Sequence, residues 1–431
     1  MGVSSGVILA ATQSRSGKTT MTLALMAHLA KRNIPVAPFK AGPDYLDGAW
    51  HQEVSRRPSY NLDTFMLGNE ACRTLYQQKK GHALGVVEGV MGLYDGKSGV
   101  GGTGSTADLA RVLGLPVLLV VNVRGMAGSL VPLVQGFAAA AQGFTIAGIL
   151  ANQVGSAQHA QRLSALLDDN HAPPLLGWMG RHEHLTLEER HLGLTLPGET
   201  SSPPWEQLAA ALHLDQERFT HLFQPTPARE PDLSLRVEPL LQGKTIAVAR
   251  DAAFSFIYTA NLECLVQMGA TVHFFSPLAG NAIPDACSAI WLPGGYPELH
   301  AEKLSQSRTL QQLTRLGQNG TCILAECGGM MALGEYLVDL AGRSWPMAGL
   351  LPMQSIMTSR LAGLGYRQED SGMRGHEFHH SIREASPLPP AFSLNRGDPG
   401  LRLANVRASY VHWYFPSAPR VLAAWLGGTR I

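Results

Sequence analysis

Short apolar runs alternate with amphipathic stretches through the first half of the chain. Runs with the length and composition of buried strands lie at residues 7–11, 36–39, 84–87, 116–121 and 145–150. The stretch 19–30 follows the first run and has the composition of a helix that ends at Lys31 and Arg32. Strands that alternate with helices in this way are typical of a doubly wound, mostly parallel α/β sheet, which we expect here.

The second half repeats this alternation after a break in the pattern. Residues 223–239 (FQPTPAREPDLSLRVEP) are rich in proline and charge and have little periodicity, which is typical of a linker. Beyond them, apolar runs at 245–249, 271–275, 289–292 and 322–325 predict a second set of strands with helices between them. We therefore predict two doubly wound domains, residues 1–225 and 243–431, joined by a linker at 226–242.

Composition and charge narrow the class of protein. The 431 residues suffice for two or three domains, and 45% of them are hydrophobic. The formal net charge is +1, so no basic field suggests a nucleic-acid partner. The five cysteines form no CxxC pair, which argues against a disulfide framework or a structural zinc site and predicts a cytoplasmic protein.

Targeting and membrane segments are not expected. The mildly apolar start lacks a basic region and runs directly into a Gly-Lys-Thr loop, which predicts a first strand and not a signal peptide. Apolar runs such as residues 115–123 are far shorter than the roughly 18 residues that a membrane span needs.

A phosphate-binding loop is predicted between the first strand and the first helix. Such a loop points backbone N–H groups and the positive end of a helix at phosphate oxygens. Lys18 would reach the β- and γ-phosphates of a nucleotide, and the Thr19 hydroxyl would ligate Mg²⁺. Thr12 stands where the full pattern has glycine, and Arg15 lies inside the loop. The predicted ATP-binding residues are Ser16, Gly17, Lys18, Thr19 and Thr20.

Acidic segments follow two further strands of the same predicted sheet. Residues 40–47 (KAGPDYLD) come after the second strand, and residues 88–96 (EGVMGLYDG) come after the next. The carboxyl ends of parallel strands lie at one edge of the sheet, so both segments should approach the phosphate loop. Glu88 is placed for a second Mg²⁺ contact, Asp44 and Asp47 could hold metal or orient substrate, and Lys40 could meet a carboxylate or phosphate.

A nucleophile is predicted where the apolar run at 322–325 meets Cys327 and two glycines. A sharp turn from strand to helix would expose the thiol, and the start of the helix would lower its pKa. The backbone N–H groups of Gly294, Gly295 and Gly328 could form an oxyanion hole for a tetrahedral intermediate.

The general base should be a histidine that is distant in sequence and close in space. His412 lies at the end of an apolar run in SYVHWYF, and GHEFHH at residues 375–380 is the other candidate cluster. The three histidines of that cluster lack companion Cys or Asp ligands at the spacing of a zinc site, so we predict no metal there.

Seven motifs in one order resemble the cobyrinate or hydrogenobyrinate a,c-diamide synthase family across nearly the whole chain. They are GKTT at residues 17–20, KAGPDYLD at 40–47, EGVMGLYDG at 88–96, LPGGYPE at 292–298, ECGGM at 326–330, GHEFHH at 375–380 and SYVHWYF at 409–415. The resemblance implies a dethiobiotin-synthetase-like P-loop domain followed by a class I glutamine amidotransferase domain. It also implies ATP, glutamine and a corrin polycarboxylate as substrates, Mg²⁺ as cofactor, and a homodimer as the assembly to consider.

By the same resemblance, Cys327 is the glutaminase nucleophile and His412 is its base. The residues that match the substrate-binding motifs of the synthetase site are Lys40, Asp44, Tyr45, Leu46, Asp47, Glu88 and Asp95, with Thr19, Asp44 and Glu88 as metal ligands. Many class I amidotransferases carry a glutamate two residues after the histidine, where this chain has Tyr414. The residue that orients His412 is therefore left open.

The implied reaction is ATP-dependent amidation of the a and c carboxylates of a corrin acid, with ammonia released from glutamine. Alternatives with the same architecture are cobyric acid synthase and the diamide synthase of nickel sirohydrochlorin. The KAGPDYLD and EGVMGLYDG segments favour the corrin diamide synthase over cobyric acid synthase. A P-loop regulatory ATPase with an inactive amidase domain is the alternative from another class, and the presence of both Cys327 and His412 argues against it.

Overall fold

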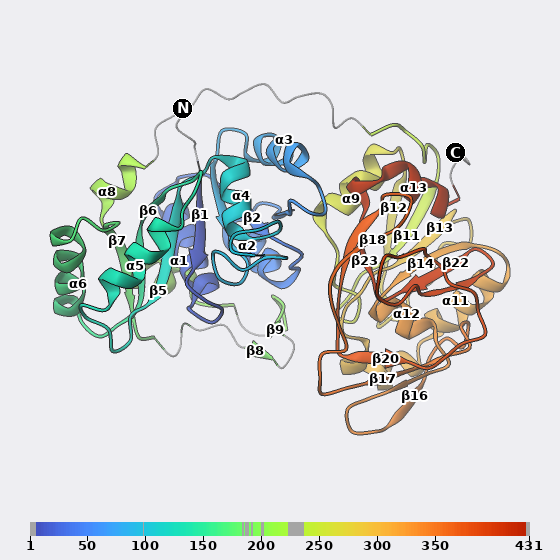
Figure 1. Ribbon diagram of the computed structural model, residues 1–431. Helices are drawn as coiled ribbons and strands as arrows, with labels where there is room; N and C mark the ends of the chain where they lie inside the picture. The colour runs from blue at the N-terminus through green and yellow to red at the C-terminus, as the bar shows by residue number, and fades with distance from the viewer. Residues whose placement is uncertain are drawn as a thin grey trace. The chain divides into compact units, whose positions relative to one another are not determined.

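Figure 1 shows the computed structural model, which describes residues 6–97, 99–182, 185, 189–190, 193–199, 202–222 and 237–427. The chain divides into two compact units, Met1–Leu235 and Arg236–Ile431. Residues 226–236 of the predicted linker lie outside the described residues. Each unit is therefore considered by itself.

The first unit contains an eight-stranded sheet with the order β10-β7-β6-β5-β1-β4-β2-β3. Its strands are β1 (Gly6–Ala11), β2 (Val36–Ala41), β3 (Tyr60–Leu62), β4 (Leu84–Glu88), β5 (Val117–Asn122), β6 (Ile146–Val154), β7 (Leu175–Gly180) and β10 (Leu212–Leu214). All neighbouring strands are parallel except β10 and β7. Since β1, β4 and β2 are adjacent, the loops that follow them leave the same edge of the sheet.

Helices connect these strands, as the alternating pattern predicts. They are α1 (Lys18–Lys31), α2 (Leu46–Ser55), α3 (Asn69–Lys80), α4 (Thr106–Leu113), α5 (Leu130–Ala139), α6 (Ala157–Asp169), α7 (Trp205–Ala211) and α8 (Gln216–His221), and a small pair is formed by β8 (Glu189–Arg190) and β9 (Gly193–Leu194). Every residue of β1 is buried. A strand covered on both faces by helices needs such a continuous apolar run and not an alternating one.

The second unit has a six-stranded sheet with the order β12-β11-β13-β14-β22-β21. Its strands are β11 (Thr245–Ala249), β12 (Thr271–Phe275), β13 (Ala289–Leu292), β14 (Cys322–Glu326), β21 (Leu401–Leu403) and β22 (Val406–Ser409), and its helices are α9 (Thr259–Gln267), α10 (Ala301–Ser305), α11 (Arg308–Gln318), α12 (Gly328–Leu333), α13 (Pro419–Trp425) and the short 3₁₀ turns η3 (Pro297–His300) and η4 (Phe415–Ser417). All pairs are parallel except β21 with β22.

Successive residues of β13 belong to two different apolar clusters. Ile290 and Leu292 pack in the cluster that contains side chains of α11 and α12. Ala289 and Trp291 pack in the cluster that contains side chains of α9 and α13. Because neighbouring side chains of a strand point to opposite faces, helices cover both faces of this sheet. The prediction of a doubly wound parallel sheet is thus confirmed in both units.

Two smaller sheets in the second unit were not predicted from the sequence. One has the order β16-β15-β17-β20 and the other β18-β19-β23. Their strands are β15 (Tyr336–Val338), β16 (Ser344–Pro346), β17 (Gln354–Met357), β18 (Gly363–Gln368), β19 (Arg374–His379), β20 (Ser381–Arg383) and β23 (His412–Tyr414). The antiparallel register of β19 and β23 places His376 opposite His412, so the two histidine clusters of the sequence are neighbours.

Helices long and apolar enough to traverse a bilayer are absent from the part of the chain that the structure describes.

Two paired glycines leave room for a buried tyrosine in the first unit. Gly6 of β1 is opposite Gly85 of β4, and Tyr76 of α3 is packed onto both. A Cβ atom on Gly85 would lie 2.2 Å from the Tyr76 Oη, and one on Gly6 would lie 1.9 Å from it. Helix α3 can therefore approach the sheet only where both positions lack a side chain.

We expect Gly85→Ala to lower the free energy of unfolding by about 1–3 kcal/mol, because the added methyl group overpacks this contact. The shift of the unfolding transition on heating measures the effect. Gly136→Ala in α5 is the matched control, since its added Cβ would meet nothing within 4 Å apart from the neighbouring backbone of its own helix. Alanine is the better helix former, so the control should be neutral or stabilising. Equal transitions for the two variants would contradict this account of the Tyr76 contact.

Candidate functional site

The loop between β1 and α1 is fixed by an asparagine from a different strand. Asn152 of β6 donates a hydrogen bond from Nδ2 to the Ser16 carbonyl oxygen at 3.0 Å. Gly17 has a φ of 85° and directly precedes α1. A Cβ atom on Gly17 would lie 2.0 Å from the Asn152 Nδ2. Glycine is therefore required here both for the left-handed backbone and for the close approach of Asn152.

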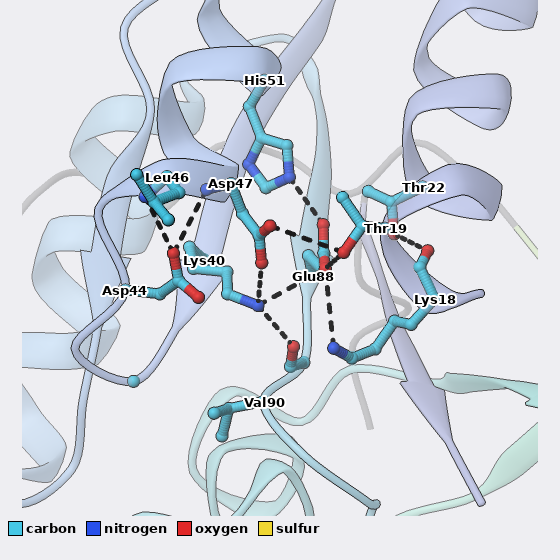
Figure 2. Close-up of polar contacts among 12 residues, drawn as sticks. Lys18, Thr19, Thr22, Lys40, Asp44, Leu46, Asp47, His51, Glu88 and Val90 are labelled. Atoms are coloured by element: carbon cyan, nitrogen blue, oxygen red, sulfur yellow. Dashed lines mark hydrogen bonds and ion pairs between the residues drawn. The ribbon is translucent and has the colours of Figure 1, made fainter. Parts of the chain in front are cut away.

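Glu88 at the end of β4 is the centre of the candidate nucleotide site (Figure 2). Its Oε1 accepts a hydrogen bond from the Thr19 hydroxyl at 2.6 Å and lies 3.5 Å from the Lys18 Nζ and 3.4 Å from the Lys40 Nζ. Its Oε2 lies 2.8 Å from the Nε2 of His51. The side chain of Glu88 is fully buried. Three segments that the sequence predicts to converge thus meet on one carboxylate.

Lys40 joins this carboxylate to a second one. Its Nζ lies 2.7 Å from the Asp47 Oδ2 and donates a hydrogen bond to the Gly89 carbonyl oxygen at 2.8 Å. Burial by itself would lower the pKa of Lys40, but the carboxylates of Asp47 and Glu88 raise it above its usual value. Burial would likewise raise the pKa of Glu88, yet Lys40 and Lys18 hold it well below the usual range. Lys40 and Glu88 are therefore both charged at neutral pH.

The pKa of Lys18 is shifted in the opposite direction to that of Lys40. Burial and the neighbouring ammonium group of Lys40 lower the pKa of Lys18. Two buried cations beside one another are costly, and an anionic ligand would relieve the repulsion. This is the electrostatic setting expected for a group that binds phosphate oxygens.

Asp44 and Asp47 make different contacts in the structure, although the sequence offers the same two options, a metal ligand or a substrate contact, for both. The Asp44 Oδ1 accepts hydrogen bonds from the backbone N–H groups of Leu46 and Asp47, at 2.9 and 3.1 Å, at the start of α2. Tyr45 immediately precedes that helix. The Asp47 carboxylate instead faces Lys40, and its Oδ1 lies 3.5 Å from the Thr19 hydroxyl. Of the two aspartates, it is Asp47 that approaches Thr19 of the phosphate loop.

The oxygen atoms of Thr19, Asp47 and Glu88 fit a hard divalent cation. Mg²⁺ takes oxygen ligands and is usually held by one or two carboxylates together with the phosphates of its substrate. Within the described residues there is no group of three or more His, Cys, Asp or Glu side chains placed to hold a metal ion. A magnesium ion in this site would accordingly depend on the Thr19 hydroxyl and on nucleotide phosphates.

The segment that carries Asp95 lies against the carboxyl-terminal part of β1, just before the phosphate loop. The backbone N–H groups of Gly89 and Leu93 donate to the carbonyl oxygens of Leu9 and Ala11, each at 2.8 Å. The Asp95 Oδ2 accepts a hydrogen bond from the Gly92 N–H at 3.0 Å. Asp95 therefore shapes its own loop, at the edge where the other predicted residues meet.

His51 is absent from the predicted site residues, although its imidazole touches Glu88. A signal for it exists in the sequence, because His51 lies four residues after Asp47, and residues i and i+4 of a helix share one face. The Nδ1 atom of His51 lies 3.2 Å from the Ser59 Oγ. The imidazole is thus positioned on both sides.

The strand-to-helix turn predicted at Cys327 is present in the second unit, but Cys327 is buried and not exposed as predicted. Cys327 lies between β14 and α12 with φ 46° and ψ −109°, a strained backbone for a residue that is not glycine. Its N–H donates to the Ser409 carbonyl oxygen at 2.7 Å. A Cβ atom on Gly329 would lie 2.2 Å from the Leu292 carbonyl oxygen, so glycine is needed for the helix to start this close to β13.

Glycines of LPGGYPE lie beside both Cys327 and His412. A Cβ atom on Gly294 would lie 2.2 Å from the Cε1 of His412 and 3.3 Å from the Cβ of Cys327. One on Gly328 would lie 3.2 Å from the backbone nitrogen of Gly295. The thiol, the imidazole and the three predicted oxyanion-hole glycines therefore form one cluster.

The pKa of Cys327 was predicted to be lowered by the start of a helix, but it is raised overall, although the Gly328 N–H at the start of α12 does act to lower it. Burial and the nearby Glu298 carboxylate raise the pKa of this thiol above its usual value. Helix α12 has only six residues, so its dipole is weak against the loss of hydration. Burial and the adjacent His376 and His379 hold the pKa of His412 well below its usual value. The thiol and the imidazole are therefore both neutral at pH 7.

The histidine cluster at residues 376–380 lies next to His412. The rings of His376 and His412 are stacked with centroids 5.0 Å apart. Tyr258 places its hydroxyl oxygen 3.2 Å from the Nδ1 of His376. His379 stacks on Tyr410 at 3.7 Å. Among the candidate histidines, His412 is the one that lies next to Gly294 on the same side as Cys327.

Both units match known families. Residues 7–194 match the CobQ/CobB/MinD/ParA nucleotide binding domain, and residues 245–419 match the CobB/CobQ-like glutamine amidotransferase domain.

Full-length relatives carry two related names. The chain is 37% identical over 429 residues to a cobyrinate a,c-diamide synthase of Herminiimonas arsenicoxydans, covering 97% of this chain and 95% of the relative. It is 37% identical to the enzyme of that name from Salmonella typhimurium, covering 98% of each chain. It is 38% identical to a hydrogenobyrinate a,c-diamide synthase of Pseudomonas aeruginosa, again covering 98% of each chain.

We expect iodoacetamide to alkylate Cys327 slowly at pH 7. Because the pKa of the thiol is raised, the thiolate fraction should still be rising by about tenfold per pH unit beyond pH 9. Mass spectrometry of the Cys327 peptide as a function of pH measures this rate. The unfolded chain is the control and should level off near the ordinary thiol pKa. A plateau near pH 7 to 8 in the folded protein would contradict the assignment.

Proposed function

Since the chain belongs to the family of cobyrinate and hydrogenobyrinate a,c-diamide synthases, we propose that it uses ATP and glutamine to amidate the a and c carboxylates of a corrin acid in cobalamin biosynthesis. One observation carries the proposal beyond family membership. A phosphate-loop cluster around Glu88 and a cysteine–histidine cluster at Gly294 occur in one chain, and the two together support the proposal. Amidation of a carboxylate needs both an activated acid and a source of ammonia.

The first unit would activate the carboxylate. A corrin carboxylate attacks the γ-phosphorus of ATP, which gives an acyl phosphate and ADP. Lys18 would contact the β- and γ-phosphates, while Lys40, Asp47 and Glu88 fix the geometry around them. Magnesium, when bound, would offset the phosphate charge, and Thr19 and Glu88 with Asp44 or Asp47 would hold it.

The second unit would release ammonia from glutamine. His412, neutral and adjacent, takes the proton of the Cys327 thiol as the sulfur attacks the side-chain amide carbon of glutamine. The N–H groups of Gly294, Gly295 and Gly328 would stabilise the oxyanion of the tetrahedral intermediate. The imidazolium returns the proton to the departing ammonia, and water then hydrolyses the glutamyl thioester. Ammonia attacks the acyl phosphate and displaces phosphate, and the cycle repeats at the second carboxylate.

An assay with two corrin acids would identify the substrate. Relatives with both names cover this chain to a similar extent, so cobalt-containing cobyrinate and cobalt-free hydrogenobyrinate are both tested. Purified protein with ATP, Mg²⁺ and glutamine should form a diamide from at least one of them, detected by mass spectrometry. ATP hydrolysis with no amide from either acid would instead favour the regulatory ATPase.

We expect Cys327→Ser and Lys18→Ala to separate the two half-reactions. The serine hydroxyl barely ionises at pH 7, so the glutamine-dependent rate should fall by about a thousandfold or more. Product should still form from ammonium, since the acyl phosphate does not involve Cys327. Lys18→Ala should abolish product from either nitrogen source, because no amine replaces its charge on the phosphates. Equal inactivity of both variants with ammonium would refute this division of labour.

We expect Asp44→Ala and Glu88→Ala to abolish amidation with ammonium as well as with glutamine. Both residues lie in the first unit, and Glu88 contacts Thr19, Lys18 and Lys40. Product formation from each nitrogen source is measured in parallel. Glu70→Ala is the matched control, because this carboxylate on α3 has an exposed side chain. Substantial ammonium-driven product from both site variants would remove them from the synthetase site.

A further inference from the structure

The backbone that follows His412 is held by side chains from two other elements. The Trp413 N–H donates a hydrogen bond to the Oε1 of Glu326 at 3.0 Å. Asn261 of α9 donates from Nδ2 to the Trp413 carbonyl oxygen and accepts from the Phe415 N–H, each at 2.8 Å. Glu326 and Asn261 are each only 1% exposed. The backbone of the segment that carries His412 is therefore fixed by hydrogen bonds to buried polar side chains.

Glu326 occupies a particular place between the two reacting residues. It is the last residue of β14 and directly precedes Cys327, while its hydrogen-bond donor Trp413 directly follows His412. On the other side, the Cys327 N–H donates to the Ser409 carbonyl oxygen at 2.7 Å. These two hydrogen bonds tie the nucleophile segment to the base segment on both sides of the Cys327–His412 contact.

We propose that Glu326 is the positioning residue of His412, acting through its hydrogen bond with the Trp413 backbone. The proposal rests on the glutaminase role of Cys327 and His412. It supplies the orientation that Tyr414, two residues after the histidine, does not supply as a carboxylate. Here the carboxyl group comes from the residue before the nucleophile and holds the main chain of the base. It does not need to touch the imidazole.

The role requires an acceptor oxygen at a fixed distance and not a negative charge. Burial raises the pKa of Glu326 to about 8, although the hydrogen bond from the Trp413 backbone opposes this. The carboxyl group is therefore mostly protonated at pH 7 and accepts through its carbonyl oxygen. Glutamine has the same length and a similar carbonyl acceptor. Aspartate keeps the ionisable group but is one methylene shorter, so it would leave the buried Trp413 N–H without its acceptor.

Steady-state glutaminase kinetics of the full chain test the inference with Glu326→Gln and Glu326→Asp. We expect Glu326→Gln to keep kcat within about threefold of wild type. Glu326→Asp should lower kcat by at least about tenfold, with the KM for glutamine within about twofold, because loss of the buried hydrogen bond moves the base and not the bound substrate. Ammonium-dependent amidation should be unchanged in both variants. Glu302→Gln on α10, an exposed carboxylate, is the matched control.

Three results would contradict the positioning role of Glu326, and each can be told apart from a failure of the proposed function. A kcat near wild type for Glu326→Asp would overturn the positioning role. Loss in Glu326→Gln with retention in Glu326→Asp would show that charge acts, which also overturns it. Should circular dichroism show that Glu326→Asp is unfolded, Glu326→Met gives the same comparison, since it keeps the length without the oxygen, and normal turnover there would overturn the role. Absence of amide from wild type with ammonium would count against the proposed function, whereas the variant glutaminase rates judge Glu326 alone.

Discussion

The burial of ionisable groups is the constraint on which both candidate sites depend. An unpaired buried charge costs several kcal/mol, so a group removed from water must find an opposite charge or become neutral. The first unit takes the first course. Glu88 is fully buried and stays ionised because Lys18, Lys40 and the Thr19 hydroxyl surround its Oε1 while His51 contacts its Oε2. The strands β2, β4 and β1 are adjacent so that these groups can meet.

The second unit takes the other course. The raised pKa of Cys327 reflects burial and the Glu298 carboxylate, and His412 lies among other imidazoles. Thiol and imidazole are consequently both neutral, and in the proposed reaction the proton moves between them as the thiol attacks glutamine. Burial of ionisable groups thus leads to a set of paired charges around Glu88 in one unit and to an uncharged thiol and imidazole in the other.

Close backbone approach is the second requirement shared by the sites. Gly17 lets Asn152 reach the phosphate loop, and Gly294 lets the imidazole approach the thiol. Each glycine is next to, or between, the residues whose chemistry it permits. Glu326 and Asn261 add polar contacts to the backbone around His412, so the position of the base is set by main-chain hydrogen bonds as well as by packing.

The sequence by itself determined the motif order and the strands that leave clear apolar runs, but not the two smaller sheets of the second unit. The strands at 245–249 and 289–292 were predicted with their observed bounds, because a buried parallel strand leaves a local apolar run. The strand at 271–275 was also predicted with its observed bounds, although it lies at the edge of the sheet and only its Phe275 is buried. The convergence of Lys40 and Glu88 also followed, since both were placed at the carboxyl ends of strands in one parallel sheet, where they are in fact paired. Tertiary structure alone decided the contact of His51 with Glu88, the register that pairs His376 with His412, and the bond from Trp413 to Glu326. It also reversed the predicted pKa shift of Cys327, because hydration and the nearest charge depend on residues far apart in the chain, and no local pattern records them.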